Sequence, residues 1–288
     1  MLRPVRVAFA TCSALPDGWH DDHLAASLLG AEYRSWDDAS VDWEAFDRVV
    51  IRSTWDYTSR VADFVSWCHS VGSERLRNRP DLVAFNADKR YLGRLAAPTV
   101  PTVYVAPGDA LPRLDGEVVV KPGISAGARD TGRFGPAAHG EARSLIEQIQ
   151  VSGRVALVQP YIASVDHRGE TALVFLGGEL SHVLRKRPIL ERDEVAPLAE
   201  GELAPARAML REDLVALDTA EAAEHRLARQ VVRQVSEAFG TPVYMRVDVV
   251  IGPGAGPLLL EFEAIEPHLY LTASAGAAQR LADAVRAS

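Results

Sequence analysis

The sequence has few cysteines, no long apolar run and no excess of positive charge, and each shortage argues against a class of protein. Without a run of about 18 apolar residues or an N-terminal h-region, we expect neither a membrane span nor export, which favours the cytoplasm. The net charge of −8 opposes nonspecific attraction to nucleic acid, and no aromatic-interleaved basic stripe compensates for it. Cys12 and Cys68 lack a second Cys or His at metal-binding spacing, so we expect buried thiols rather than a disulfide or zinc site.

The composition is that of a globular enzyme, with 48% hydrophobic and 24% charged residues among 288. A chain of this size can bury a core divided among two or three modest domains. Its first part alternates strand-like runs, at residues 5–10 and 48–51, with amphipathic segments at about 21–30 and 60–71. That alternation predicts a small parallel sheet with helices on its faces and ligands at the carboxyl ends of its strands.

The pattern changes near residue 98 to a mixture of strands and helices. Residues 86–96 are helix-like, and the prolines at 98 and 101 then break the pattern. Further strands are expected at about 117–121, 155–159, 170–176 and 179–186, with a helix near 139–149. We therefore predict three domains, at 1–97, 98–165 and 166–288.

The segment 188–217 is rich in Pro, Ala, Glu and Arg without firm periodicity. In a compact domain this predicts a mobile lid, with a surface insertion as the alternative. Asp218 to Glu221 predict a capping box for a helix that ends at Gly240, and an Ala-rich segment at about 271–286 predicts a last helix.

Before that last helix, the sequence predicts a β-hairpin. Residues 243–251 form a β-branched strand, 252–257 a turn of Gly and Pro, and 258–263 a second strand. A symmetric turn pairs Ile251 with Leu258.

Three carboxylates would share one face of this hairpin, because that pairing places Asp248 opposite Glu261 and Arg246 opposite Glu263. So much negative charge among apolar neighbours is costly unless a cation neutralises it. Oxygen ligands select a hard ion, and Mg²⁺ bridging nucleotide phosphates suits them. A solvated sheet face is the alternative, with about even odds on the hairpin alone.

Upstream features would suit a nucleotide. Lys121 ends a buried-looking strand and enters a small-residue loop, 123–128, whose backbone N–H groups can approach phosphate; the Walker order is absent. Lys89 lies early in the expected helix 86–96, where an exposed helix lysine is the alternative. Residues 159–162 end an apolar strand along which an adenine could lie.

The ordered set of these motifs resembles the ATP-grasp superfamily, which contains glutathione synthetase and D-alanine–D-alanine ligase, over roughly residues 80–288. The resemblance implies an N-terminal parallel α/β domain, a small central lobe and a C-terminal antiparallel sheet that carries the metal site. The positions that match ATP-binding residues are Lys89, Lys121, Ser125, Gly127, Gln159, Tyr161, Ile162, Asp166 and Glu170, with Glu170 as the ribose carboxylate. Those that match Mg²⁺ or Mn²⁺ ligands are Asp248, Glu261 and Glu263, where the family usually has Asn at the third position.

Two segments are similar to a subgroup of the superfamily, namely 51–57 (IRSTWDY) and 261–267 (EFEAIEP). That subgroup includes the O-ureido-serine cyclo-ligases of D-cycloserine formation. The likeness implies an ATP-dependent carboxylate–amine ligase that forms an acylphosphate, acts on a small amino-acid-like substrate and releases ADP and phosphate. Family ligases are often homo-oligomers. An ATP-grasp kinase and a non-catalytic ATP-binding module are the alternatives.

Further polar residues are candidates for chemistry and substrate binding. We expect Arg246, Lys121 and the basic run 185–187 to stabilise the transferred group. Within that run, alternation puts only Arg185 and Arg187 on one face, and a solvated strand end beside the lid is the alternative. The expected substrate-binding residues are Arg52, Ser53, Thr54, Asp56 and His268, while Trp55 and Tyr57 could equally be core residues. Asp21 and Asp22 are expected to cap the first helix rather than to bind a metal.

Overall fold

The computed structural model describes residues 5–201 and 203–288, so the first four residues and residue 202 of the expected lid lie outside it. Its N-terminal part is a parallel four-stranded sheet in the order β2-β1-β3-β4. The strands are β1 (Val7–Thr11), β2 (Glu32–Ser35), β3 (Arg48–Ile51) and β4 (Leu76–Arg77), and the helices are α1 (His23–Leu29), α2 (Val61–Val71) and α3 (Pro80–Asn86). The predicted parallel sheet is confirmed. The helix expected at 86–96 is wrong, because Asp88 caps a separate 3₁₀ helix, Lys89–Arg94, by accepting from the Arg90 amide.

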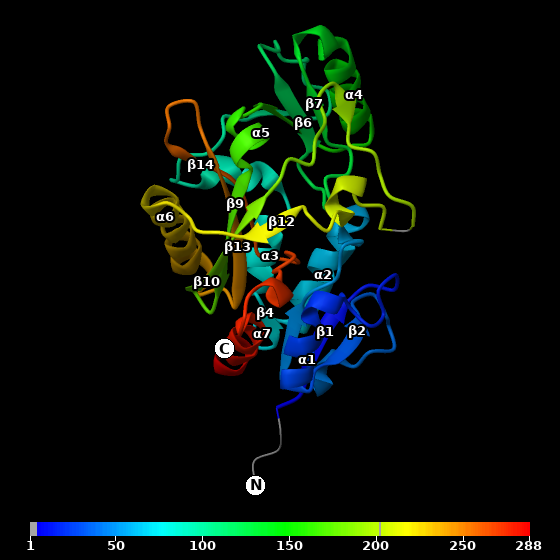
Figure 1. Cartoon of the computed structure of the whole chain (residues 1–288). Coiled ribbons are helices and arrows are strands. Elements are labelled where there is room, and N and C mark those ends of the chain that lie inside the picture. Colours follow the sequence, from blue (N-terminus) through cyan, green and yellow to red (C-terminus); the bar gives the residue numbers. More distant parts are fainter. Residues whose placement is uncertain (1–4, 202) are drawn as a thin grey trace.

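A second sheet, entirely antiparallel, forms the upper part of the molecule in Figure 1. Its order is β11-β7-β6-β8-β5, with β5 (Val103–Val105), β6 (Val118–Pro122), β7 (Gly132–Phe134), β8 (Ala156–Pro160) and β11 (Glu194–Val195). The helix α4 (His139–Val151) buries its apolar residues against this sheet in a core of its own. Strand β11 comes from the expected lid, so that segment returns to the sheet formed earlier in the chain.

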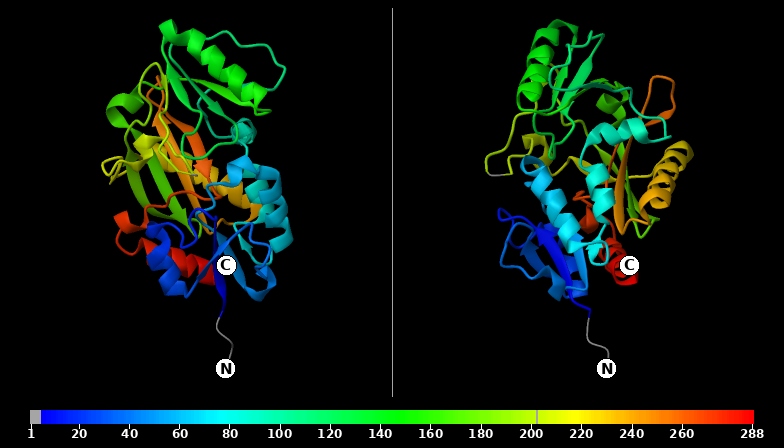
Figure 2. Two further views of the ribbon diagram at one scale, coloured as in Figure 1. Left: turned by 90° about the vertical axis from the view of Figure 1, so that its right-hand side faces the viewer. Right: turned by 180° about the vertical axis from the view of Figure 1, so that it is seen from behind.

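The third sheet lies between the other two and carries the carboxylate hairpin (Figures 1 and 2). Its order is β12-β10-β9-β13-β14, with β9 (Glu170–Leu176), β10 (Glu179–Lys186), β12 (Val215–Leu217), β13 (Tyr244–Ile251) and β14 (Pro257–Glu263). The helix α6 (Ala222–Phe239) covers one face, and α7 (Ala277–Ala287) packs on the other together with residues of β1 and α1. The short helix α5 (Ser164–Arg168) links β8 to β9.

Other details differ from the sequence prediction. The capping box of α6 is formed by Glu221 and Glu224, not by Asp218 and Glu221, because the Asp218 carboxylate binds Arg185 and the Thr219 amide instead. The helix does end at Gly240, as predicted. The last helix begins only at Ala277, after a 3₁₀ turn at Leu271–Ala273. Both cysteines are buried free thiols, as predicted.

No helix within the described ranges combines the length and apolarity that a membrane crossing requires.

Candidate active site

The pairing of β13 with β14 places the acidic residues as predicted. Arg246 pairs with Glu263 and Asp248 with Glu261. The predicted pairing of Ile251 with Leu258 is wrong, because Ile251 pairs with Pro257 and a bulge between Asp248 and Val249 shifts the register by one. A bulge of this kind bends the strand beside the acids and leaves their own register unchanged.

The three acidic side chains converge. Ligand oxygens of Asp248, Glu261 and Glu263 all lie within 4.8 Å of one another. The Asp248 side chain is fully buried, and those of Glu261 and Glu263 are only 18% and 33% exposed. The alternative of a solvated sheet face is therefore wrong.

Two cations hold the most deeply buried of these acids. Arg246 binds both oxygens of Asp248, at 2.9 and 3.0 Å, and also contacts Glu263. The Lys186 amino group lies 2.8 Å from Asp248 and 2.9 Å from Glu170. Burial would raise the pKa of Asp248, but these cations outweigh it and lower the pKa to about 2. Asp248 is thus a carboxylate at neutral pH.

Within the basic run 185–187, the structure brings Lys186 to the pocket and not Arg185, the reverse of the choice favoured by strand alternation. Lys186 lines the pocket, while Arg185 donates to Asp218 and Thr171. A regular hairpin through the turn at 177–178 would pair Arg185 with Glu170. The irregularity between Leu180 and His182 shifts the register and pairs Lys186 with Glu170 instead. No local signal in the sequence marks that irregularity.

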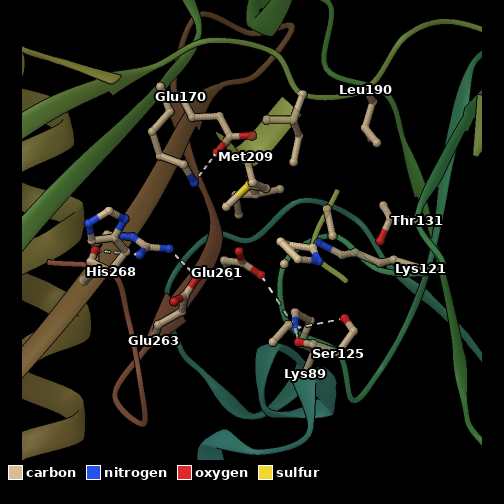
Figure 3. Close-up of a pocket in the computed structure, with 18 of the residues that line it drawn as sticks. Lys89, Lys121, Ser125, Thr131, Glu170, Leu190, Met209, Glu261, Glu263 and His268 are labelled. Atoms are coloured by element: carbon tan, nitrogen blue, oxygen red, sulfur yellow. Dashed lines mark hydrogen bonds and ion pairs between the residues drawn. The ribbon is translucent and has the colours of Figure 1, made fainter. Parts of the chain in front are cut away.

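The two predicted phosphate-binding lysines face the same cavity as the acids, which Figure 3 shows with Lys121 reaching in from the side opposite the hairpin. Lys89 donates to the Ser125 carbonyl at 2.9 Å and lies 4.0 Å from Glu261. Lys121 is 9% exposed, and within the described part of the chain no carboxylate lies at ion-pair distance from it. Burial lowers the pKa of Lys121, which Glu261 partly opposes. A buried, unpaired cation facing a cavity favours an anionic ligand there.

The cavity has a volume of about 440 Å³ and extends from the hairpin acids to the end of β8. The predicted ATP-binding residues that line it are Lys89, Lys121, Ser125, Gly127, Gln159, Tyr161, Ile162 and Glu170. Asp166 does not line it, since its carboxylate binds Arg133 and the Tyr161 hydroxyl. Glu170 lies beside Lys186 and Asp248, at the acidic end of the cavity.

Part of the expected lid, 188–217, covers the cavity. Its apolar contribution comes from Pro188, Ile189, Leu190, Leu203, Pro205, Met209 and Leu210. The Ala206 amide donates to the Gly127 carbonyl at 2.7 Å, which joins this segment to the small-residue loop. Two segments that are far apart in the sequence therefore enclose the same side of the cavity.

An aromatic wall lines one side of the cavity. It consists of Trp19, Trp55 and Tyr57, from segments that follow β1 and β3, and of His268 and Tyr270, from the loop after β14. The rings of Trp19 and Trp55 lie 5.4 Å apart, and those of His268 and Tyr270 stack at 3.9 Å. Trp55, Tyr57 and His268 line the pocket, and Tyr57 is at the same time a buried member of the N-terminal core.

The other predicted substrate residues do not line the pocket. Arg52 is buried, binds Asp22 at 2.9 Å and donates to the Pro267 carbonyl at 3.1 Å. Ser53 accepts from the Trp19 amide, and Asp56 accepts from the Trp36 indole. Thr54 is buried. Arg52 and Ser53 hydrogen-bond to the segments that carry the aromatic wall. The positions of all four residues do not support the prediction that they contact the substrate directly.

Asp21 and Asp22 do not cap the first helix, contrary to the sequence prediction. Asp21 accepts hydrogen bonds from the amides of Leu271 and Thr272, while Asp22 pairs with Arg52. Both acids therefore connect the N-terminal sheet with the loop after β14.

A parallel N-terminal sheet, two antiparallel sheets and an enclosed cavity with two lysines facing paired acids define an ATP-grasp ligase. The structure shares the fold of D-alanine–D-alanine ligase from Bacillus anthracis in its complex with ATP, with a TM-score of 0.63 at 12% identity over 98% of this chain and 96% of that one. A family model of the N-terminal domain of D-cycloserine synthetase DcsG matches residues 7–78. The chain is also 35% identical over 272 residues to the cycloserine biosynthesis protein DcsG of Streptomyces lavendulae, covering 89% of this chain and 88% of that protein.

The crystal structure of D-cycloserine synthetase DcsG superposes with a TM-score of 0.83 at 29% identity, over 97% of this chain and 98% of that one. The chain belongs to the DcsG family of ATP-grasp proteins, and it is an ATP-dependent ligase.

Proposed function

We propose that the chain closes a ring in a small amino acid, with O-ureido-D-serine as the substrate, in the cytoplasmic biosynthesis of D-cycloserine. The observation that carries the ligase chemistry is the convergence of Asp248, Glu261 and Glu263 opposite Lys89 and Lys121. The choice of substrate rests on the relatives, whose names assign them to cycloserine biosynthesis.

The donor set fits a hard divalent cation, for which we propose Mg²⁺, with Mn²⁺ as a substitute. The three residues offer carboxylate oxygens only, and they lie close enough together to share one ion or two. When bound by Asp248, Glu261 and Glu263, the ion would neutralise negative charge on the phosphates of ATP. The family usually has Asn at the position of Glu263. The Glu263 carboxylate therefore brings an extra negative charge, which its ion pair with Arg246 partly neutralises.

The chain's own residues would then hold and orient the reactants. Lys89 and Lys121 neutralise the phosphates, and the end of β8 with Ile162 holds the adenine. Arg246 and Lys186 lie beside Asp248, where they are placed to stabilise negative charge on the transferred phosphoryl group. The parts 98–165 and 166–288 enclose ATP in this proposal, and 1–97 supplies the wall on the substrate side.

Ring closure proceeds in two steps in this proposal. An oxygen of the substrate carboxylate attacks the γ-phosphorus of ATP, which forms an acylphosphate and releases ADP. The nitrogen bound to oxygen in the same substrate then attacks the acyl carbon, the C–O bond to phosphate breaks, and the nitrogen loses its proton. These two steps close the ring, whose nitrogen still carries the carbamoyl group of the ureido moiety. One water molecule then cleaves that N–C bond, and the carbamoyl group leaves as carbon dioxide and ammonia. Binding in the cavity favours ring closure because it holds the nitrogen close to the acyl carbon.

The test is to incubate the protein with O-ureido-D-serine, ATP and Mg²⁺ and to quantify ADP, phosphate and product. We expect ADP and phosphate in equal amounts together with D-cycloserine, carbon dioxide and ammonia. AMP and pyrophosphate would contradict the acylphosphate route. A stable phosphorylated product without free phosphate would identify a kinase, and ATP binding without turnover over a screen of amino acids would identify a binding module.

A further inference from the structure

The proposed function leaves one buried acid of the cavity without a role. Glu266 follows β14, lines the cavity and is only 9% exposed. Within residues 5–201 and 203–288, no Lys or Arg comes within ion-pair distance of its carboxyl, whose hydrogen-bond donor is its own amide. Burial and the nearby Glu263 raise the pKa of Glu266 to about 8, so the carboxyl is neutral at neutral pH in the free protein. A cationic ligand beside it would stabilise the charged carboxylate.

Glu266 is separate from the acids proposed to hold the metal. The converging group consists of Asp248, Glu261 and Glu263. The cations nearby are also engaged elsewhere, since Arg246 and Lys186 bind Asp248, and Lys89 donates to the loop at Ser125. Lys89 and Arg246 therefore act on Glu266 only from a distance, and a cationic ligand in the cavity would be the direct ion-pair partner of its carboxylate.

The surroundings of Glu266 suit an organic cation. The aromatic wall lines the same cavity, with the Trp19 ring 5.4 Å from that of Trp55 and 6.2 Å from that of His268. Aromatic faces attract ammonium groups. Among the described residues, the buried Trp19 indole N–H has no acceptor, so a ligand that offers an oxygen there as well as an ammonium group would satisfy it.

Glu266 is held by the N-terminal sheet rather than by its own strand alone. Its carbonyl accepts from the Trp55 indole at 3.0 Å, and the next carbonyl, of Pro267, accepts from Arg52 at 3.1 Å. Both contacts fix the backbone and leave the carboxyl free to bind a ligand. A loop fixed in this way is pre-organised, which lowers the entropic cost of binding.

We infer that Glu266, with the aromatic wall, binds the α-ammonium group of the substrate. This rests on the proposed function, because the carboxylate of the same molecule is activated at the hairpin, three residues earlier at Glu263. One zwitterionic amino acid then spans the two subsites, with its carboxylate near Arg246 and its ammonium at Glu266. The enzyme therefore selects amino acids with a free ammonium over simple carboxylic acids.

The test pairs a side-chain change with a ligand change. Calorimetry measures dissociation constants in the presence of Mg²⁺ and a non-hydrolysable ATP analogue. Two ligands carry the ammonium group, O-ureido-D-serine and D-serine. Their counterparts without it are 3-(ureidooxy)propanoate and 3-hydroxypropanoate. We expect the wild type to prefer the ammonium forms by about 30-fold or more, the loss typical of unpairing a buried charge. Glu266→Gln should lose most of that preference, and Glu266→Asp should retain part of it.

Glu266→Gln should fold at least as stably as the wild type, since it removes an uncompensated buried acid, and its affinity for the ATP analogue should not change. Glu237→Gln, on the exposed face of α6, is the matched control and should bind all ligands as the wild type does. Three results would overturn the inference: equal affinities in the wild type, a preference that survives in Glu266→Gln, or no binding of either ammonium compound. A preserved ammonium preference without D-cycloserine formation would instead overturn only the proposed function.

Discussion

The indole N–H of Trp55 donates to the carbonyl of Glu266 at 3.0 Å, across 211 positions of sequence. Together with Arg52 and Asp21, this contact attaches the loop after β14 to the N-terminal sheet. The distinctive segment at 51–57 therefore acts on the site through the loop that it fixes, and only Trp55 and Tyr57 of that segment line the cavity.

The Trp55–Glu266 hydrogen bond should support substrate binding. Trp55→Phe keeps an aromatic ring in the wall but removes the N–H donor. The loss of one hydrogen bond is worth about 1 kcal/mol, so KM for the amino-acid substrate should rise about five-fold. The KM for ATP should stay unchanged, because the contact lies at the substrate end. Steady-state kinetics with each substrate varied in turn measure both values, and Trp43→Phe, in the core of the N-terminal part, is the control. A change confined to KM for ATP would contradict this account.

The neighbouring residues Lys186 and Arg185 should differ sharply in importance. Lys186→Met leaves Glu170 without its cation and Asp248 with Arg246 alone, so we expect turnover to fall about 100-fold or more. We also expect the free energy of unfolding to fall by about 3 kcal/mol, because a buried ion network loses a partner. Arg185→Met removes a partly exposed pair with Asp218 and a hydrogen bond to Thr171, and should cost less than Lys186→Met, about 1 kcal/mol.

Chemical denaturation measures the free energy of unfolding of both variants, and phosphate release measures their turnover. Equal losses of turnover in Lys186→Met and Arg185→Met would show that the register of β10 with β9 does not determine which of the two cations acts at the site.

The role of the hairpin acids as metal ligands is tested by Glu261→Gln. The substitution preserves size and removes the charge that faces Lys89 and Lys121, so folding should survive. Turnover at saturating ATP should fall about 100-fold or more, and the Mg²⁺ concentration for half-maximal rate should rise. A titration of activity against Mg²⁺ measures both. Wild-type kinetics in this variant would refute the assignment of Glu261.

His268 should make the stability of the protein depend on pH. Burial lowers the pKa of His268 to about 4, although Asp21 opposes the shift, so the ring is neutral in the folded protein at neutral pH. The unfolded chain, with a His pKa of about 6.5, binds more protons between pH 6.5 and 4, so stability rises with pH across that window. Acidification from pH 7.5 to 4.5 should thus destabilise the wild type by up to about 3 kcal/mol through this residue.

The His268→Gln variant isolates that contribution from the acidic residues, which titrate in both proteins. Urea unfolding at both pH values should show a smaller difference for the variant than for the wild type. An equal pH dependence in the two proteins would show that His268 does not titrate on unfolding in this range.

Most elements and the order of the ATP-binding motifs could be predicted from the sequence. Strand alternation is local, so the pairing of Asp248 with Glu261 and of Arg246 with Glu263 followed from the position of one turn. The predicted pairing next to the turn was wrong by one residue. The pairing of the acids was still correct, because the bulge lies between them and the turn.

The same local reasoning failed at Lys186. One irregularity between Leu180 and His182 shifts the register of β10, so Lys186 takes the position opposite Glu170 that a regular hairpin would give to Arg185. It failed also for the segment at 51–57, whose polar side chains were expected at the substrate.

The sequence by itself thus determined which residues could bind ATP and a cation, because their spacing along strands and loops is a local property. Only the tertiary structure decided that Lys186 faces Asp248, that Arg52 and Trp55 hold the loop after β14, and that Glu266 lies buried without a counterion. Each of these depends on contacts between segments more than 60 residues apart in the chain, as for Lys186 and Asp248 at a separation of 62. Packing and bulges set such contacts, and neither leaves a local mark in the sequence.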